Sequence, residues 1–566
     1  MAIALTFAGT AFAGLAPYVP SDSWAPLHDP PTYEAKLRQV NLLGGLGSSF
    51  DGIRYLIQHG DELVPSLAPF TAALPANLTV EPGLSNLALA TQAYLALYGG
   101  PAMALYGATN AGQQVPLNSF FHIYRLYINS GFIPVANGVS LYSFAGYSLA
   151  NGPLLLELPP YSGGYFVVPF YDIYGLTFAS LGSAHGNAGG GKWLIATHDW
   201  AWEGDESDLP EGLVGIIRSP TIEGGIVGRT NFNGTGAGPW TLTWKLEPWA
   251  PAAKPVLPPP PQGLGYGYPD QDPKALFATN PSDPLAFWRL AGEVYRRNGG
   301  PSIPQPLAAQ LTRLGLYRDY GFIPYGLSAN VSDALALAPI LATRILVARY
   351  TFLGSPATNY WHLPVNNGDW GNDYVLGAAI MKGFWVSNLL RDAAYYYQYL
   401  DASATPLHGN NTYTLEFPAA PPATSQAFWS LVALDLDNWT LLFGPDFANQ
   451  PLTSAGAGLY VRPNGSIPIR VQAKPPPANT TAEGRGWNWV QSYPGNFQLI
   501  LRVYAGGPSV LANTYVPPPV VRVVDVPQPS PGPSLSSPSP VVASPSPSPS
   551  GNSTAPAGNS TSPAAH

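Results

Sequence analysis

The 566-residue chain is too long for a single hydrophobic core, and its length predicts two or three domains. Only 10% of its residues are charged, whereas 64 are Pro and 60 are Gly, a composition that suits short strands joined by tight turns and excludes an all-helical protein. The net charge of −8, without a basic stripe, disfavours nucleic acid and other polyanion partners, and the absence of cysteine excludes disulfides, thiolate metal sites and a cysteine nucleophile.

The N-terminal segment 1–19 carries no charge and is rich in Ala, Leu, Phe and Gly. Within it, Ala11-Phe12-Ala13 has the small-x-small form of a signal-peptidase site, so we interpret 1–19 as a signal segment that lacks the usual positive start. An ordinary buried N-terminal segment is the alternative. The following range, 20–130, is predicted to be an N-terminal helical region, because an apolar stripe recurs there at helical spacing. The stripe consists of Leu87, Ala90, Tyr94, Leu97 and Tyr98.

Residues 131–252 change to short apolar runs separated by Gly, Asn and Pro, which is typical of a β-sandwich. The predicted strands are Leu154–Leu158, Tyr165–Val168, Trp193–Ala196, Leu213–Ile217 and Trp240–Trp244. A Pro-rich linker, 253–282, follows this first β-sandwich domain.

Residues 283–405 are predicted to be a helical region. Asp283-Pro284 has the form of a helix start, and two longer helices are expected over Ser332–Arg349 and Tyr374–Tyr399. The charge of Arg344 within the first of these apolar stretches argues against a stable membrane span.

Residues 406–525 return to strands and are predicted to be a second β-sandwich domain. Its expected strands are Tyr413–Phe417, Phe428–Leu434, Ile467–Val471 and Phe497–Tyr504. Residues 526–566 form a Pro/Ser-rich tail in which Ser544–Ser550 strictly alternates Ser and Pro, so it is expected to be disordered and extended. The tail is similar to the Ser-Pro modules of O-glycosylated wall and matrix proteins, and a plain flexible spacer is the alternative. The predicted fold class is therefore α+β, mainly β, with two β-sandwich or jelly-roll-like domains, an intervening helical layer and a disordered tail.

Acceptor motifs for N-glycosylation are frequent along the chain. N-glycosylation takes place in the secretory pathway, so these motifs favour a secreted or wall-associated glycoprotein. We therefore predict an extracellular or cell-wall location. The candidate acceptors are Asn77, Asn233, Asn330, Asn410, Asn464, Asn479, Asn552 and Asn559.

Short motifs in a shared order give the chain a resemblance to a known family combination. The stretch 137–230 resembles domain of unknown function 1254, and the stretch 371–523 resembles its usual partner, domain of unknown function 1214. The pieces that carry this are Gly152-Pro153, Ser219-Pro220-Thr221, Gly228-Arg229, Gly371-Asn372-Asp373-Tyr374, Phe428-Trp429-Ser430-Leu431, Asn488-Trp489 and Leu501-Arg502-x-Tyr504. The resemblance implies two β-sandwich or jelly-roll-like domains around a helical layer and a homo-oligomer, and it implies no known activity.

The chain departs from the family pattern at three positions. The family's Asn-x-Asp-Thr-x-Tyr motif corresponds to Asn137–Tyr142, in which the acid is replaced by Val139. Two positions that are commonly Arg are Gly164 and Ala184. If these groups form a polar site in relatives, that site is altered here, which lowers the expectation of catalysis.

Seven residues are candidate ligand-binding residues: Asn137, Tyr142, Asp172, Arg229, Asp373, Asp435 and Trp489. Asp172 follows an aromatic run, and Arg229 is its candidate partner, either in a structural ion pair or in a clamp for a substrate carboxylate. Asp373 is either a helix cap or a ligand-facing carboxylate, and Asp435 has a similar ambiguity. Trp489 belongs to one of several aromatic clusters that suit sugar binding but more often fill cores.

No cofactor and no metal site is predicted, because no group of His, Asp and Glu has a known ligand spacing. His185 could act as a general base, but no residue is spaced to orient it. The sequence thus favours a noncatalytic secreted or wall-associated glycoprotein that binds a glycan, a small-molecule ligand or its own copies. The alternative is an enzyme that acts on a small apolar or carbonyl-containing substrate between the domains, with Asp172, Arg229 and Asp373 as its polar groups.

Overall fold

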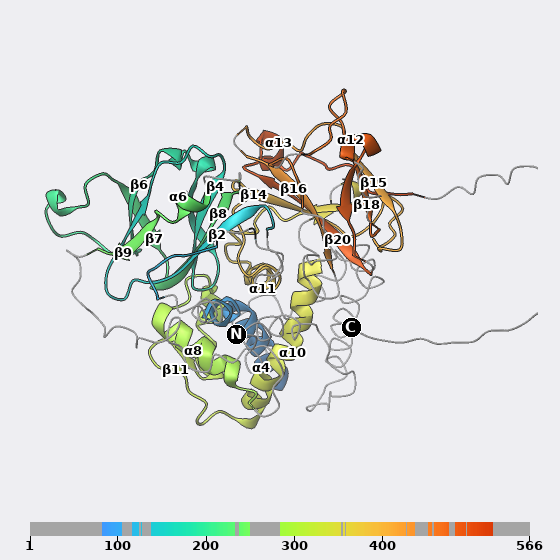
Figure 1. Ribbon diagram of the computed structural model, residues 1–566. Coiled ribbons are helices and arrows are strands. Elements are labelled where there is room, and N and C mark those ends of the chain that lie inside the picture. The colour runs from blue at the N-terminus through green and yellow to red at the C-terminus, as the bar shows by residue number, and fades with distance from the viewer. Residues whose placement is uncertain are drawn as a thin grey trace, which may run out of the picture. The chain divides into compact units, whose positions relative to one another are not determined.

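The chain is a mixed α+β protein with more strand than helix, and it contains two regions that each have two β-sheets (Figure 1). The computed structural model describes residues 82–104, 116–123, 126, 137–232, 237–249, 283–351, 355–356, 358–425, 427–435, 451–455, 458–474, 481–493 and 495–523. The segment 1–19, the whole linker 253–282, the tail 526–566 and the acceptors Asn77, Asn233, Asn479, Asn552 and Asn559 lie outside these residues.

The first β region combines a five-stranded sheet, in the order β1-β2-β8-β4-β5, with a four-stranded sheet, in the order β7-β6-β3-β9. The five strands are β1 (Phe121–Ile123), β2 (Ser140–Ser148), β4 (Phe166–Asp172), β5 (Thr177–Gly182) and β8 (Glu223–Asn231). The four strands are β3 (Leu154–Leu158), β6 (Gly191–Thr197), β7 (Leu213–Ser219) and β9 (Lys245–Pro248). Three short 3-10 turns lie between them: η1 (Ser183–His185), η2 (Asn187–Gly189) and η3 (Glu206–Asp208).

Alternation of apolar and polar residues explains how the two sheets share a core. In β3, Leu154, Leu156 and Leu158 are buried and the residues between them are half-buried, as expected when one face of a strand points inward. These leucines pack in one cluster with residues of the other sheet, such as Phe166 and Ile226.

The expected strand Trp240–Trp244 is wrong. This stretch holds the short helix α6 (Ala237–Thr241) and a turn before β9. Gly238-Pro239 precedes Trp240, and proline lacks the amide that a strand ladder needs while its fixed φ suits the first turn of a helix. The indole of Trp244 is nevertheless buried, in the core of the first β region.

The helices form a third structural unit. Its longer helices are α4 (Pro82–Leu97), α8 (Ala286–Asn298), α10 (Ala329–Thr351) and α11 (Tyr374–Gly383). Shorter elements accompany them: α9 (Gln305–Ala308), η5 (Leu311–Leu314), β10 (Leu316–Tyr317) and β11 (Gly321–Phe322). Buried residues of these helices belong to a single apolar cluster that also includes Tyr142 from β2, Tyr397 from β14 and Ile500 from β20. The helices therefore pack against the larger sheet of each β region.

Polar and close backbone contacts fix the helices against the first β region. Asn298, at the end of α8, donates from Nδ2 to the buried Glu223 carboxylate at 2.8 Å, and its Oδ1 accepts the amide of the same residue at 2.8 Å. At Gly99 a Cβ would lie 1.9 Å from the carbonyl oxygen of Tyr174, so only glycine allows this approach.

Two expected helices differ in their bounds. The helix predicted over Tyr374–Tyr399 ends at Gly383, and Ala393–Gln398 is strand β14, which pairs with β20. Its aromatic run Tyr395–Tyr397 favours a sheet. Helix α8 begins at Ala286, and Asp283 does not cap it but pairs with Arg289. The expected helix Ser332–Arg349 is confirmed within α10.

The second β region combines a six-stranded sheet, in the order β12-β13-β14-β20-β16-β17, with a four-stranded sheet, in the order β19-β18-β15-β21. The six strands are β12 (Ser355–Pro356), β13 (Trp361–Leu363), β14 (Ala393–Gln398), β16 (Trp429–Asp435), β17 (Leu452–Thr453) and β20 (Phe497–Tyr504). The four strands are β15 (Tyr413–Phe417), β18 (Ile467–Gln472), β19 (Asn488–Gln491) and β21 (Val521–Arg522). Short helical elements here are η6 (Thr358–Tyr360), α12 (Ala482–Arg485) and α13 (Pro508–Leu511).

Three strands of this six-stranded sheet, β12 to β14, come from the range 283–405 that was expected to be helical. The core between the two sheets contains Trp361 from β13 and Trp429 from β16, both fully buried. In the described parts of the chain, no helix is both long and apolar enough to cross a membrane.

Candidate functional site

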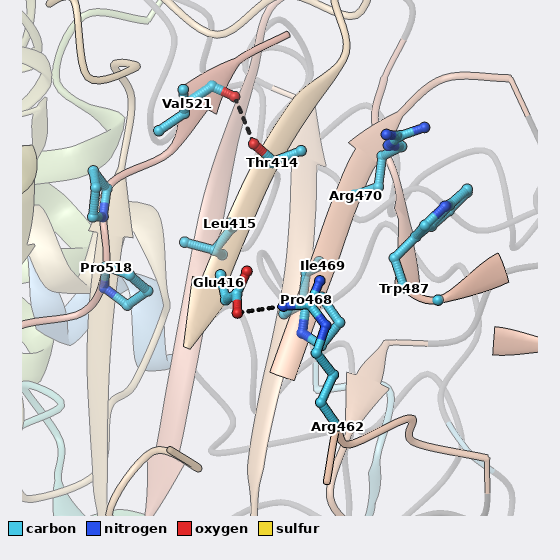
Figure 2. Close-up of a pocket in the computed structure, with 12 residues that line it drawn as sticks. Thr414, Leu415, Glu416, Arg462, Pro468, Ile469, Arg470, Trp487, Pro518 and Val521 are labelled. Atoms are coloured by element: carbon cyan, nitrogen blue, oxygen red, sulfur yellow. Dashed lines mark hydrogen bonds and ion pairs between the residues drawn. The ribbon is translucent and has the colours of Figure 1, made fainter. Parts of the chain in front are cut away.

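A groove lies on the outer face of the four-stranded sheet of the second β region (Figure 2). Its volume is about 270 Å³. The residues that line it are Thr414, Leu415, Glu416, Arg462, Pro468, Ile469, Arg470, Gly486, Trp487, Pro518, Pro519 and Val521.

Strand alternation explains why polar side chains face this groove. In β18 the residues Ile467, Ile469 and Val471 are buried in the core, so the intervening Arg470 points to the other face. In β15 the same alternation turns Thr414 and Glu416 outward. The backbone partners of Arg470 are Thr414 on β15 and Trp489 on β19.

Trp487 brings an aromatic ring to the groove. The guanidinium carbon of Arg470 lies 4.9 Å from the centre of this ring, and that of Arg485 lies 5.0 Å from it. Both distances are within the range of a cation–π interaction. The ring therefore holds two positively charged groups in place.

The backbone that carries Trp487 is itself fixed. Thr481 caps α12, its hydroxyl accepting the Gly484 amide at 3.0 Å, and Gly486 ends the helix with a left-handed φ of 73°. Asn488 is buried and donates to the carbonyl oxygens of Tyr460 at 2.8 Å and Pro468 at 3.0 Å. These bonds define the direction in which the ring points.

The two arginines that line the groove differ in whether a carboxylate neutralises them. Glu416 pairs with Arg462 at 2.5 Å, and both side chains are partly exposed. Arg470 pairs with no carboxylate of the described chain, and its Nε makes no hydrogen bond. One arginine of the groove is thus compensated and one is not.

Three of the sequence-predicted residues meet elsewhere, in a buried polar cluster where the two β regions touch. Asn137 donates its backbone amide to the Tyr142 hydroxyl at 2.8 Å and its Nδ2 to the Tyr504 hydroxyl at 2.5 Å. The guanidinium of Arg229 lies over the Tyr142 ring at 5.7 Å and donates to Asn388 Oδ1 at 2.9 Å. The cluster joins side chains of both β regions.

The ion pair expected between Asp172 and Arg229 is wrong. Arg229 donates to the Tyr171 hydroxyl, the Val227 carbonyl and Asn388, all of which are neutral. Asp172 instead accepts the amides of Tyr174 at 2.9 Å and Leu176 at 3.0 Å, and so closes the turn between β4 and β5. Burial raises the pKa of Asp172 to about 7, although these amide hydrogen bonds lower it in part.

The remaining predicted residues have separate environments. Asp373 is exposed and caps α11, accepting the Leu376 amide at 2.9 Å. Asp435 ends β16, and its side chain lies outside the described residues. Trp489 is half-buried on the groove face of β19 and donates its Nε1 to the Gln472 carbonyl at 3.0 Å. Asp172, Arg229 and Asp373, the expected polar groups of an enzyme, therefore have three different sets of partners.

His185 has a partner that the sequence did not suggest. Its Nε2 lies 2.7 Å from Oδ1 of Asp392, whose side chain is fully buried at the start of β14. The carbonyl of Asp392 accepts the Tyr165 hydroxyl at 2.8 Å. His185 and Asp392 are 207 residues apart, so only the folded chain reveals this pair.

The sequence pointed to the aromatic cluster Trp487-Asn488-Trp489 at the groove, but Trp489 was the candidate taken from it. Trp487 lines the groove, whereas the predicted Trp489 lies two residues further along the chain, in β19, and is not among the lining residues. The alternation in β18 was the available signal for Arg470.

Among the described acceptors, Asn330, Asn410 and Asn464 are exposed. The described residues contain no group of three His, Asp or Glu that could hold a metal ion.

Together these features define a mixed α+β protein with two two-sheet regions and a cationic, aromatic groove on the second. The family described as "Protein of unknown function (DUF1254)" matches residues 117–241, and "Protein of unknown function (DUF1214)" matches residues 392–508. The chain contains both domains, which confirms the resemblance predicted from its motifs.

One solved structure agrees with this assignment at the level of the fold. The crystal structure of the VPA0106 protein from Vibrio parahaemolyticus is 17% identical, with a TM-score of 0.54, and the match covers 78% of this chain and 100% of that one. The crystal structure of an uncharacterized protein from Burkholderia cenocepacia is 11% identical, with a TM-score of 0.37, over 87% of this chain and 96% of that one. No curated protein matches the chain.

Proposed function

We propose that the protein is a noncatalytic glycoprotein of the extracellular space or cell wall that binds a glycan in the groove of its second β region. Each two-sheet region is, in this proposal, a β-sandwich of jelly-roll type. The observation that carries the proposal is the Trp487 ring in the groove, flanked by guanidinium groups and bordered by hydroxyl and carboxylate side chains.

The chemistry of the groove suits a sugar. A glycan presents hydroxyl groups that both donate and accept hydrogen bonds, and Thr414, Glu416 and Arg462 supply acceptors and donors along one wall. Flat aromatic and guanidinium surfaces complement the faces of a sugar ring. Because the side chains around Trp487 are already held by the sheet and by Asn488, little conformational freedom is lost on binding.

The first test replaces the aromatic ring. We expect Trp487→Ala to weaken binding of a glycan, identified by screening the full-length protein on a glycan array, by about tenfold or more, because it removes contact surface and releases Arg470. Isothermal titration calorimetry measures the change. Tyr325→Ala is the matched control, since Tyr325 is 89% exposed on the segment before α10. Unchanged affinity in Trp487→Ala, or no glycan bound by the wild type, would overturn the proposal.

The second test concerns export. Asn464 is exposed, in a turn between Arg462 and Ser466, and Asn410 is exposed after His408. We expect both to carry N-linked glycans in protein isolated from its native source, because their amide groups are accessible to a glycosyltransferase. Glycopeptide mass spectrometry measures occupancy. Unmodified peptides at both positions would contradict the extracellular location.

A further inference from the structure

We propose that the groove selects acidic glycans, and that Arg470 binds the carboxylate of a uronic acid residue. This inference rests on the proposed function, because it assigns the ligand class of the same groove. It departs from the expectation that the scattered charges of the chain disfavour polyanions.

Once its internal ion pair is counted, the groove keeps one positive charge that no described carboxylate compensates. The lining of the groove has three charged side chains, Glu416, Arg462 and Arg470. Glu416 is engaged by Arg462. Arg470 is left with no carboxylate partner among the residues that the structure describes, in a chain of net charge −8. A negatively charged group is the complement of such a site.

Arg470 is fixed in position both by its strand and by an aromatic ring. Its stem is fixed in β18 between two paired strands, and its guanidinium is held at the Trp487 ring. A guanidinium fixed in this way presents a planar fork of donors, which matches the two oxygens of a carboxylate. Its Nε is shielded from solvent and makes no hydrogen bond to the described chain, so the described chain does not satisfy every donor of this guanidinium.

The groove suits a uronate better than it suits a phosphate backbone. Binding to nucleic acid depends on several cations that follow successive phosphates. The groove lining offers one uncompensated arginine, with Arg485 beside the same ring. One fixed fork beside an aromatic ring and Thr414 fits a single carboxylate on a sugar. Positions 462, 470 and 485 come from three different segments, which is why these arginines form no basic stripe along the chain.

The test compares ligands that differ only at the carboxyl group. Oligogalacturonate, its methyl ester, a galactose oligomer of equal length and single-stranded DNA are titrated into the full-length protein by calorimetry. The proteins are the wild type, Arg470→Ala, Arg470→Lys and Arg218→Ala. Arg218 is the matched control, because it also lies over a tryptophan, Trp200, at 5.6 Å but belongs to the first β region.

We expect the wild type to bind oligogalacturonate at least about tenfold more tightly than the methyl ester, a preference that added salt weakens. Arg470→Ala should abolish this preference, Arg470→Lys should retain part of it because a lysine keeps the charge without the fork, and Arg218→Ala should leave it intact. Circular dichroism melting establishes that each variant is folded. If Arg470→Ala does not fold, the comparison of Arg470→Lys with the wild type still decides the test.

The outcomes separate the two proposals. If none of the oligosaccharides binds and no array glycan does, glycan binding itself is wrong. If the ester or the galactose oligomer binds as tightly as the acid, glycan binding stands and acid selection is wrong. Equal binding of single-stranded DNA, or a preference for the acid that survives in Arg470→Ala, also overturns the inference.

Discussion

Replacing Arg229 with alanine is expected to lower the free energy of unfolding by about 4 kcal/mol. Arg229 is 7% exposed, and its guanidinium donates to the Tyr171 hydroxyl at 3.1 Å, the Val227 carbonyl at 3.0 Å and Asn388 Oδ1 at 2.9 Å. The alanine variant leaves these buried groups without their donor and opens a cavity where the two β regions touch. Equilibrium denaturation by urea measures the loss.

A second substitution at the same position separates packing from hydrogen bonding. Arg229→Met fills most of the volume and removes a buried charge whose described partners include no carboxylate, so its loss should be about half that of alanine. Arg218→Ala, at an exposed site, should change stability by less than about 0.5 kcal/mol. An Arg229→Ala protein within about 1 kcal/mol of the wild type would show that the cluster does not hold the β regions together.

The Arg229 cluster shows where sequence reasoning ends. Periodicity is local, so strands such as Tyr413–Phe417 and Phe497–Tyr504 were predicted with the bounds that they have. The partner of Arg229 is a matter of tertiary packing: Asn388 lies 159 residues away along the chain. The sequence instead suggested Asp172, a nearer residue of opposite charge.

The two wrong element predictions have a similar origin. Trp240–Trp244 is apolar enough for a strand, but Gly238-Pro239 before it favours a helical turn. The stretch Tyr374–Tyr399 is mostly apolar on both sides of Arg391 and Asp392, so periodicity alone did not separate α11 from β14. The groove could be predicted only in part. Alternation in β18 predicts that Arg470 points outward, but it does not predict that Trp487 lies next to Arg470.

Asp172 makes the stability of the fold depend on pH. The pKa of this carboxyl is raised from 3.8 to about 7 by burial. Between these two values the folded chain holds a proton that the unfolded chain has released. The contribution of Asp172 to the free energy of unfolding therefore falls as the pH rises from about 4 to about 7, and this contribution is greatest on the acid side. Over about three pH units the loss amounts to about 4 kcal/mol, at 1.36 kcal/mol per unit.

The variant Asp172→Asn should remove this dependence. Asparagine is uncharged at every pH and keeps an oxygen that can accept the amides of Tyr174 and Leu176. We expect it to match the wild type near pH 4 and to be more stable by about 4 kcal/mol near pH 8, as measured by urea denaturation across this range. Asp319→Asn, at an exposed carboxylate, should leave the pH profile of the wild type unchanged. Parallel profiles for Asp172→Asn and the wild type would mean that Asp172 is ionised in the folded protein, with its charge stabilised by the turn amides and Ser302 rather than suppressed by burial.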